Sequence, residues 1–186
     1  MTQNDFIKQI HKRIAIVAVG GSALRNQGAA GLVDIARFYF ENAIVLDDLF
    51  GCLHNESSFS KFLDTHTTGL LNKFPVNGKS WGAARKGLNL FFRDLVYNKF
   101  IAEKYKLAAN FQQFNDQIKH LEVPLDSFVA QGLFGKSSKE LPRWISIKEL
   151  QPEKSKKYQA FALEYATDLN IARVNLDLLF WQPAKG

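Results

Sequence analysis

The chain has 186 residues, of which 46% are hydrophobic and 13% are aromatic, so it can bury a core and is not a disordered polymer. Its formal net charge is +6, which suggests an anionic partner such as nucleic acid. No apolar run approaches the length of a membrane-spanning helix, the N-terminus lacks an apolar signal core, and Cys52 is the single cysteine. We therefore expect a cytoplasmic protein without membrane contact, intrachain disulfide or cysteine metal cluster.

The N-terminal part of the sequence predicts helices. An apolar run over residues 14–19 ends at Gly20 and Gly21, which favours a helix that terminates at glycine. The alternative is a strand that leads into a phosphate-binding turn, although neither the Walker pattern nor the dinucleotide glycine pattern is complete. Periodicity predicts a mostly buried helical segment over residues 32–53, and the polar residues 55–60 predict a turn.

A break at Pro-Val-Asn-Gly, residues 75–78, separates this N-terminal half from the central segment. Apolar residues at helical spacing then predict one long amphipathic helix over residues 87–107. Glycines, serines and a proline predict an irregular stretch over residues 132–142. Residues 152–169 predict another helix, because Pro152 suits a first helical turn and the aromatic and alanine residues after it keep helical spacing.

The segment from Trp81 to Asp94 combines the residues with the clearest chemistry. A glycine-containing turn precedes Lys86, which we expect at the start of a helix, where the dipole disfavours a charged amine. A neutral amine can attack an electrophilic carbon and form a Schiff base. Asp126, which follows in Val-Pro-Leu-Asp, can stabilise positive charge, transfer a proton or cap a helix that starts at Ser127.

These motifs resemble the helix-hairpin-helix DNA glycosylases, and especially the archaeal-type 8-oxoguanine DNA glycosylase/AP lyases. In that family a catalytic lysine follows a glycine-containing hairpin and precedes a Phe-x-Arg-Asn/Asp element, as Lys86 precedes residues 91–94. Val-Pro-Leu-Asp126 is similar to the apolar tripeptide before the family's catalytic aspartate. Leu-Asp-Leu-Leu-Phe-Trp181 is similar to its C-terminal element. The three matches cover roughly the last hundred residues.

The resemblance implies an all-α fold in which residues 1–186 form one domain with two packed lobes, at about 1–74 and 75–186. It implies a helix-hairpin-helix near residues 70–105 and an active site in the cleft between the lobes. Lys86 would be the nucleophile and Asp126 its assistant, with no metal and no organic cofactor. The implied partner is double-stranded DNA with a damaged or modified base, bound by a monomeric, nucleoid-associated repair enzyme, and 8-oxoguanine is the leading candidate base.

The resemblance also implies DNA contacts around these two residues. The hairpin amides would hold a phosphate, and the expected DNA-binding residues are Gly78, Lys79, Gly82, Arg85 and Arg93. Trp181 and Gln27 are the expected contacts to the extruded base. Independently of the resemblance, the adjacent charges of Arg93 and Asp94 favour a structural polar pair.

Two departures from the family pattern leave other functions open. Ala84 stands where the family usually has a second glycine, which affects the expected phosphate contact. The separation of Lys86 from Asp126 is longer than usual and predicts an additional excursion over residues 106–121. The alternative functions are a non-catalytic helix-hairpin-helix DNA-binding protein and a glycosylase for another modified base, for example in defence against phage.

Overall fold

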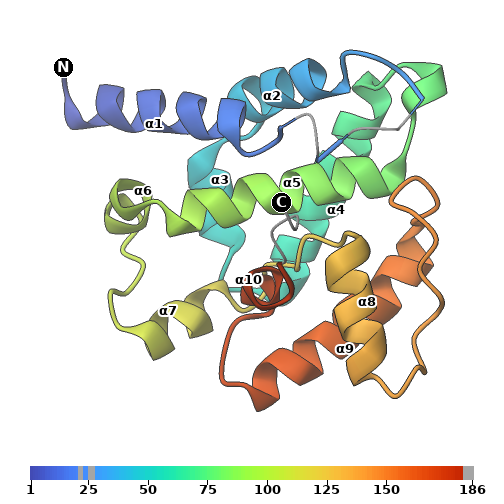
Figure 1. The fold of residues 1–186 in the computed structure, drawn as a ribbon. Coiled ribbons are helices and arrows are strands. Elements are labelled where there is room, and N and C mark those ends of the chain that lie inside the picture. The colour runs from blue at the N-terminus through green and yellow to red at the C-terminus, as the bar shows by residue number, and fades with distance from the viewer. Residues whose placement is uncertain (21–22, 25–27, 182–186) are drawn as a thin grey trace, which may run out of the picture.

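The computed structural model describes residues 1–20, 23–24 and 28–181. These residues form helices joined by loops (Figure 1), so the all-α class is confirmed for this part of the chain. The α-helices are α1 (Gln3–Val17), α2 (Leu32–Ala43), α3 (Leu46–Cys52), α4 (Glu56–Lys73), α5 (Trp81–Tyr97), α6 (Lys99–Lys104), α7 (Phe111–Ile118), α8 (Ser127–Lys136), α9 (Pro152–Asp168) and α10 (Leu176–Phe180), and the 3₁₀ helices are η1 (Val76–Gly78) and η2 (Arg173–Asn175). None of these helices is long and apolar enough to cross a membrane.

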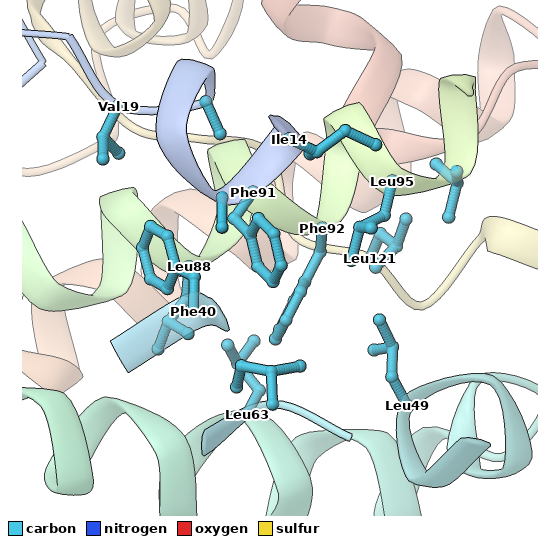
Figure 2. Packing of buried hydrophobic residues seen from close by; sticks show 14 of the residues in the cluster. Ile14, Val19, Phe40, Leu49, Leu63, Leu88, Phe91, Phe92, Leu95 and Leu121 are labelled. Atoms are coloured by element: carbon cyan, nitrogen blue, oxygen red, sulfur yellow. The ribbon is translucent and has the colours of Figure 1, made fainter. Parts of the chain in front are cut away.

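The helices pack around a large hydrophobic cluster to which α1 to α7 contribute. Figure 2 shows its centre, where aromatic rings of α5 meet side chains from α2, α3 and α4. The rings of Phe40 and Phe91 stack with centroids 4.7 Å apart, and Phe92 packs against Phe91 and Phe59. Because these rings are fully buried, removing them from water contributes a large share of the folding free energy.

A second hydrophobic cluster joins α8, α9 and α10 to residues of the loops around them. Along the chain, the first cluster runs to Leu121 and also takes in Ala172 and Val174 near η2, and the second begins at Val123, whereas we expected two lobes that divide near residue 75. Helix α5 accounts for this difference, because its buried apolar side chains face the N-terminal helices. In Figure 1, α5 crosses the middle of the molecule with α1 and α2 on one side and α8, α9 and α10 on the other.

Helix α5 starts six residues before the predicted start and ends ten residues before the predicted end, so the helix predicted over residues 87–107 is wrong in both bounds. It begins early because the Ser80 hydroxyl accepts a hydrogen bond from the amide of Ala83 at 3.1 Å and caps the helix. It ends at Asn98, whose side chain accepts hydrogen bonds from the amides of Phe100 and Ile101 and starts α6.

Local backbone geometry accounts for other differences from the sequence-based elements. Residues 56–60 are the first turns of α4 and not a turn, because the Asn55 side chain accepts the amide of Ser58. The segment 32–53 contains two helices, since the backbone is extended at Ile44 and Val45. Gly132 lies inside α8, so the irregular stretch starts only at residue 137.

Several predictions for individual segments are confirmed. Residues 75–78 interrupt the helices between α4 and α5, and Pro152 occupies the first turn of α9.

Residues 14–17 are the last turn of α1, so the strand that would lead into a phosphate-binding turn is wrong. Residues 21–22, at the centre of that alternative, lie outside the described part of the chain.

Gly82 in the first turn of α5 gives a direct test of the packing between the two clusters. A Cβ at this position would collide with the carbonyl oxygen of Ile147, in the loop before α9. We expect Gly82→Ala to lower the free energy of unfolding by about 1–3 kcal/mol, because the backbone of this loop must move. Urea unfolding followed by circular dichroism measures the change.

Gly51→Ala in α3 is the matched control, because a Cβ there meets nothing within 4 Å. We expect it to leave the stability unchanged or to raise it by up to about 1 kcal/mol, as alanine is the better helix former. Equal effects of the two substitutions would contradict the tight contact at Gly82.

Candidate functional site

Lys86 and Asp126 form an ion pair, although Lys86 lies in α5 and Asp126 is the N-cap residue before α8. The Nζ atom of Lys86 lies 3.4 Å from Oδ2 of Asp126. The Lys86 side chain is 12% exposed and the Asp126 side chain is 30% exposed, so the pair is sheltered but open to solvent on the carboxylate side. The structure therefore brings together the two residues that the sequence singled out for catalysis.

Asp126 uses its two carboxylate oxygens for two purposes. Oδ1 accepts hydrogen bonds from the amides of Phe128 at 2.9 Å and Val129 at 3.1 Å, which confirms its predicted role as the N-cap of α8. Oδ2 is the oxygen that faces Lys86. The cap fixes the direction of the carboxylate, and this direction leaves one oxygen for the amine.

Lys86 does not lie at the start of its helix, because α5 already begins at Trp81. The field of a helix dipole falls off within the first turn. Lys86 lies beyond that turn, so the prediction that the dipole acts on its amine is wrong. The immediate electrostatic partner of Lys86 is the Asp126 carboxylate.

Arg93 lies farther along α5, between two carboxylates. Its guanidinium donates to Oδ1 of Asp94 at 2.7 and 2.9 Å and also pairs with Asp177 of α10. The structural pair of Arg93 with Asp94 is therefore confirmed. Two carboxylates already compensate the charge of Arg93, which disfavours its predicted phosphate contact.

Asp177 extends this polar group towards Lys86. Burial raises the pKa of the Asp177 carboxyl above its ordinary value, the ion pair with Arg93 opposes this rise, and the nearby charge of Asp126 adds to it. Asp177 takes up a proton more readily than an exposed aspartate does. Next to it, the hydroxyl of Tyr97 donates to Oδ1 of Asn175 at 2.5 Å, and burial raises the pKa of Tyr97 to about 12.

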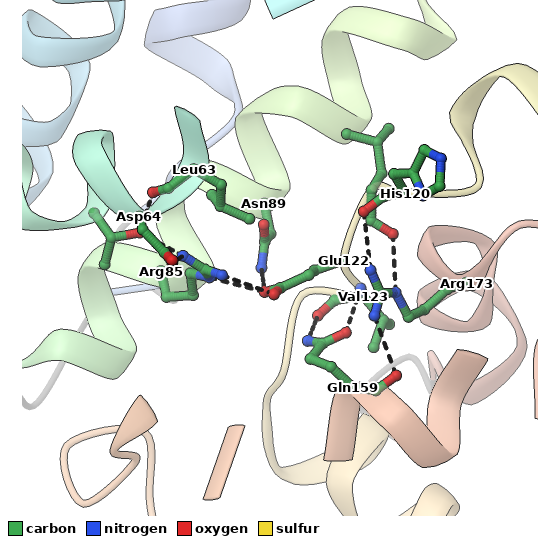
Figure 3. Close-up of polar contacts among 11 residues, drawn as sticks. Leu63, Asp64, Arg85, Asn89, His120, Glu122, Val123, Gln159 and Arg173 are labelled. Atoms are coloured by element: carbon green, nitrogen blue, oxygen red, sulfur yellow. Dashed lines mark hydrogen bonds and ion pairs between the residues drawn. The ribbon is translucent and has the colours of Figure 1, made fainter. Parts of the chain in front are cut away.

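Arg85, the neighbour of Lys86 in the chain, is buried and bound on all sides (Figure 3). It donates two hydrogen bonds to Glu122, at 2.7 and 2.8 Å, and further bonds to Asp64 and Thr67 of α4. Trp81 covers the guanidinium at 5.3 Å. Arg85 is therefore not free to contact a phosphate, which corrects its predicted role in DNA binding.

Glu122 is the acceptor at the centre of this network. Burial alone would raise the pKa of Glu122, but the charge and hydrogen bonds of Arg85 outweigh this effect and hold the pKa below its ordinary value. Asn89, one turn after Arg85 on α5, also donates to Glu122 at 3.2 Å. The carboxylate is thus fixed to α5 by two residues of that helix.

The glycines of the predicted hairpin have packing roles. The amide of Gly78 donates to the carbonyl of Pro75 at 2.8 Å, and a Cβ at Gly78 would lie 2.8 Å from the side chain of Leu32. Gly82 lies inside α5 and packs on Ile147. This packing disfavours the predicted phosphate contact of these glycines, because Gly78 uses its amide internally and Gly82 is enclosed. Lys79 is exposed and keeps its predicted DNA contact as an expectation.

Of the two residues predicted to bind a base, the structure describes Trp181 only. Trp181 follows α10 and is 66% exposed, which leaves its ring free to stack on a ligand. Gln27 lies outside the described residues. The contact of Trp181 with a base stays a prediction.

A cavity of about 430 Å³ lies between α4, α5 and α9, and Trp81, Arg85, Glu122 and Arg173 are among the residues that line it. Lys86 and Asp126 do not line this cavity. Among the described residues, no three His, Cys, Asp or Glu side chains are arranged to hold a metal ion. Comparison with protein-family models, curated proteins and solved structures finds nothing that matches this chain.

Sequence reasoning missed the ion pairs of Glu122 with Arg85 and of Asp177 with Arg93, which lie beside the catalytic candidates. Glu122 carries one usable signal, since a charged residue between the apolar Leu121 and Val123 is expected to be buried and therefore paired. Its partner Arg85 stands 37 residues earlier, and no local pattern joins the two. Asp177 stood within the C-terminal motif without an assigned role.

The Arg85–Glu122 ion pair predicts how stability depends on pH. Because the folded-state pKa of Glu122 lies below its ordinary value of 4.5, the pair stabilises the fold above that pH, and the contribution is lost as the pH falls through the folded pKa. We expect Glu122→Gln to cost about 3 kcal/mol at neutral pH, since it leaves Arg85 buried beside a neutral amide. The difference from the wild type should shrink in acid.

Urea unfolding at a series of pH values measures this difference. Asp64→Asn is the matched control, because Asp64 also pairs with Arg85 but has a side chain that is 62% exposed. We expect it to cost less than Glu122→Gln at every pH. A difference between wild type and Glu122→Gln that stays constant into acid would contradict the depressed pKa of Glu122.

Proposed function

We propose that this protein is a DNA glycosylase with AP lyase activity that excises a damaged or modified purine, with 8-oxoguanine as the leading candidate. The observation that supports it is the ion pair of Lys86 with Asp126, which joins an amine of α5 and the N-cap carboxylate of α8 at a partly exposed position. In this proposal α4, the connection through η1 and α5 form the helix-hairpin-helix.

Lys86 is the nucleophile of the first step. After Asp126 accepts a proton from the amine, the Nζ lone pair attacks C1′ of an extruded nucleotide, and the bond from C1′ to the purine breaks. The electron pair of that bond leaves with the base, which takes up the proton released by Lys86. The base takes this proton from Asp126 as it leaves, so the regenerated carboxylate, which lies 3.4 Å from the amine, compensates the positive charge on Nζ and the sugar.

The covalent intermediate leads to strand cleavage. Opening of the sugar breaks the bond from C1′ to the ring oxygen, which takes up a proton from Nζ, and gives a protonated Schiff base between C1′ and Nζ of Lys86. Loss of a proton from C2′ then breaks the bond from C3′ to its oxygen, and the 3′ phosphate leaves. In this proposal Asp126 accepts the C2′ proton, because its carboxylate lies 3.4 Å from the Nζ atom that carries the sugar. Hydrolysis of the Schiff base by water regenerates the amine.

The attack on C1′ requires the nucleotide to leave the base stack. Exposed Trp181 offers an aromatic face for the extruded base, and exposed Lys79 offers a cation for the backbone near the start of α5. Arg85 and Arg93 do not take part in phosphate binding in this proposal, because carboxylates occupy them.

Borohydride reduction of the Schiff base tests the nucleophile. We expect wild type to form a covalent adduct with duplexes that contain 8-oxoguanine or an abasic site, and we expect Lys86→Gln to form none while it still binds these duplexes. Lys99→Gln, an exposed lysine of α6, is the matched control and should react as wild type does. An undiminished adduct in Lys86→Gln would contradict the assignment.

Asp126→Asn tests the carboxylate without removing the cap, since asparagine also caps helices well. We expect thermal stability close to wild type and a strand-cleavage rate on abasic-site duplex about a hundredfold lower, because the proton acceptor is lost. Single-turnover cleavage assays and thermal melts measure the two quantities. An unchanged cleavage rate would contradict the role of Asp126.

Two results of these assays would identify the alternative functions. Salt-dependent duplex binding without any adduct or cleavage would indicate a non-catalytic DNA-binding protein. Adducts on abasic sites together with inactivity towards 8-oxoguanine would indicate another modified base, which a panel of lesion-bearing duplexes would find.

A further inference from the structure

The segment of residues 119–126 connects α7 to α8 and ends at Asp126. Its central carboxylate, Glu122, is fixed to α5 by the parallel hydrogen bonds of Arg85 and by Asn89 (Figure 3). The Arg85 side chain is 8% exposed and the Glu122 side chain is 14% exposed. The paired geometry of guanidinium and carboxylate restricts both distance and angle, so this contact fixes the register of the segment against α5.

The opposite side of the same segment is held by α9 and η2. The amide side chain of Gln159 accepts a hydrogen bond from the backbone amide of Val123 at 3.1 Å and donates to its carbonyl at 2.8 Å. Arg173 donates to the carbonyls of His120 at 2.9 Å and Leu121 at 3.2 Å. Four successive residues, 120–123, are therefore bound through backbone or side chain.

The three residues between Glu122 and Asp126 leave little freedom. Val123 and Leu125 are buried in the second hydrophobic cluster, and Pro124 between them has a fixed φ angle. Asp126 itself is held by the cap of α8. Lys86 follows Arg85 directly in α5. Each partner of the Arg85–Glu122 ion pair is therefore close in sequence to one catalytic candidate: Arg85 is one residue from Lys86, and Glu122 is four residues from Asp126.

The energetics of buried charge indicate that this ion pair fixes the relative position of its partners and adds little to stability. An Arg–Glu pair that is taken out of water gains little net stability, and apolar side chains of similar volume often replace such a pair without loss. A directional pair at this point has another effect, because it fixes the position of Asp126 relative to Lys86. Small displacements of reacting groups are costly for catalysis.

We propose that Arg85 and Glu122 are positioning residues that hold Asp126 in place for Lys86, an inference that rests on the proposed function. They act through the 119–126 segment and do not touch the substrate. Removing the ion pair should slow the chemical step while DNA affinity is kept. In a variant whose Asp126 is already inactive, removing the ion pair should not slow the step any further.

The test uses single-turnover cleavage of an abasic-site duplex at saturating enzyme, at a temperature where thermal melts show every variant folded. We expect Glu122→Gln to cleave about tenfold more slowly than wild type, with a Kd for the same duplex within about twofold. Arg85→Lys, which keeps the charge but not the paired hydrogen bonds, should also be slowed. Asp64→Asn, which removes the other carboxylate partner of Arg85, should cleave as wild type does.

A double-mutant cycle separates positioning from a general loss of structure. If Glu122 acts through Asp126, Glu122→Gln combined with Asp126→Asn cleaves as slowly as Asp126→Asn alone. The inference would be overturned if the rate reductions of the two single variants multiply in the double variant. It would also be overturned by an unchanged cleavage rate in Glu122→Gln.

Hydrogen exchange gives a readout that does not depend on catalysis. The amides of Phe128 and Val129 are protected by the Asp126 cap, so Glu122→Gln should speed their exchange while Asp64→Asn should not. Unchanged exchange in Glu122→Gln would overturn the inference. If the wild type forms no adduct with any duplex, the proposed function fails, and the exchange result still decides whether Glu122 holds Asp126.

Discussion

The ion pair of Arg85 with Glu122 is the contact on which the arrangement of this protein depends. It joins α5, whose apolar side packs into the large hydrophobic cluster, to the segment that begins the second cluster. Both charges are largely buried, and a buried charge persists only when it is paired. The pair therefore connects α5 to the segment that ends at Asp126, the N-cap of α8.

This constraint explains how an amine and a carboxylate meet without a shared element. Lys86 is placed by α5, and Asp126 is placed by the cap of α8 and by the bound segment before it. The same helix carries Arg93, whose guanidinium connects Asp94 to Asp177 in α10. One face of α5 thus collects charged groups from three parts of the chain, while its other face is buried among aromatic rings. In the proposed function the first face carries the reacting groups, and the second anchors the helix in the large hydrophobic cluster.

The sequence predicted the helical class, the break at residues 75–78, the helix after Pro152 and the cap at Asp126, because periodicity, proline and capping are local signals. It failed at the bounds of α5, where one serine and one asparagine decide the ends. The motifs around Lys86 and Asp126 marked these two residues as catalytic candidates, and the structure places them next to each other. Sequence reasoning assigned Arg85 to DNA, because a cation in the sequence looks the same whether it faces solvent or a buried carboxylate 37 residues away. Such long-range pairings depend on the tertiary fold, and no local pattern records them.

The central claim is that the amine of Lys86, held against Asp126, forms the bond to C1′. Peptide mass spectrometry of the borohydride-reduced complex with an abasic-site duplex tests it most directly, because the reduced sugar remains attached to the residue that attacked. The account predicts that the modified peptide carries the adduct at Lys86. An adduct at any other lysine or at the N-terminal amine, in protein that cleaves the duplex, would contradict it.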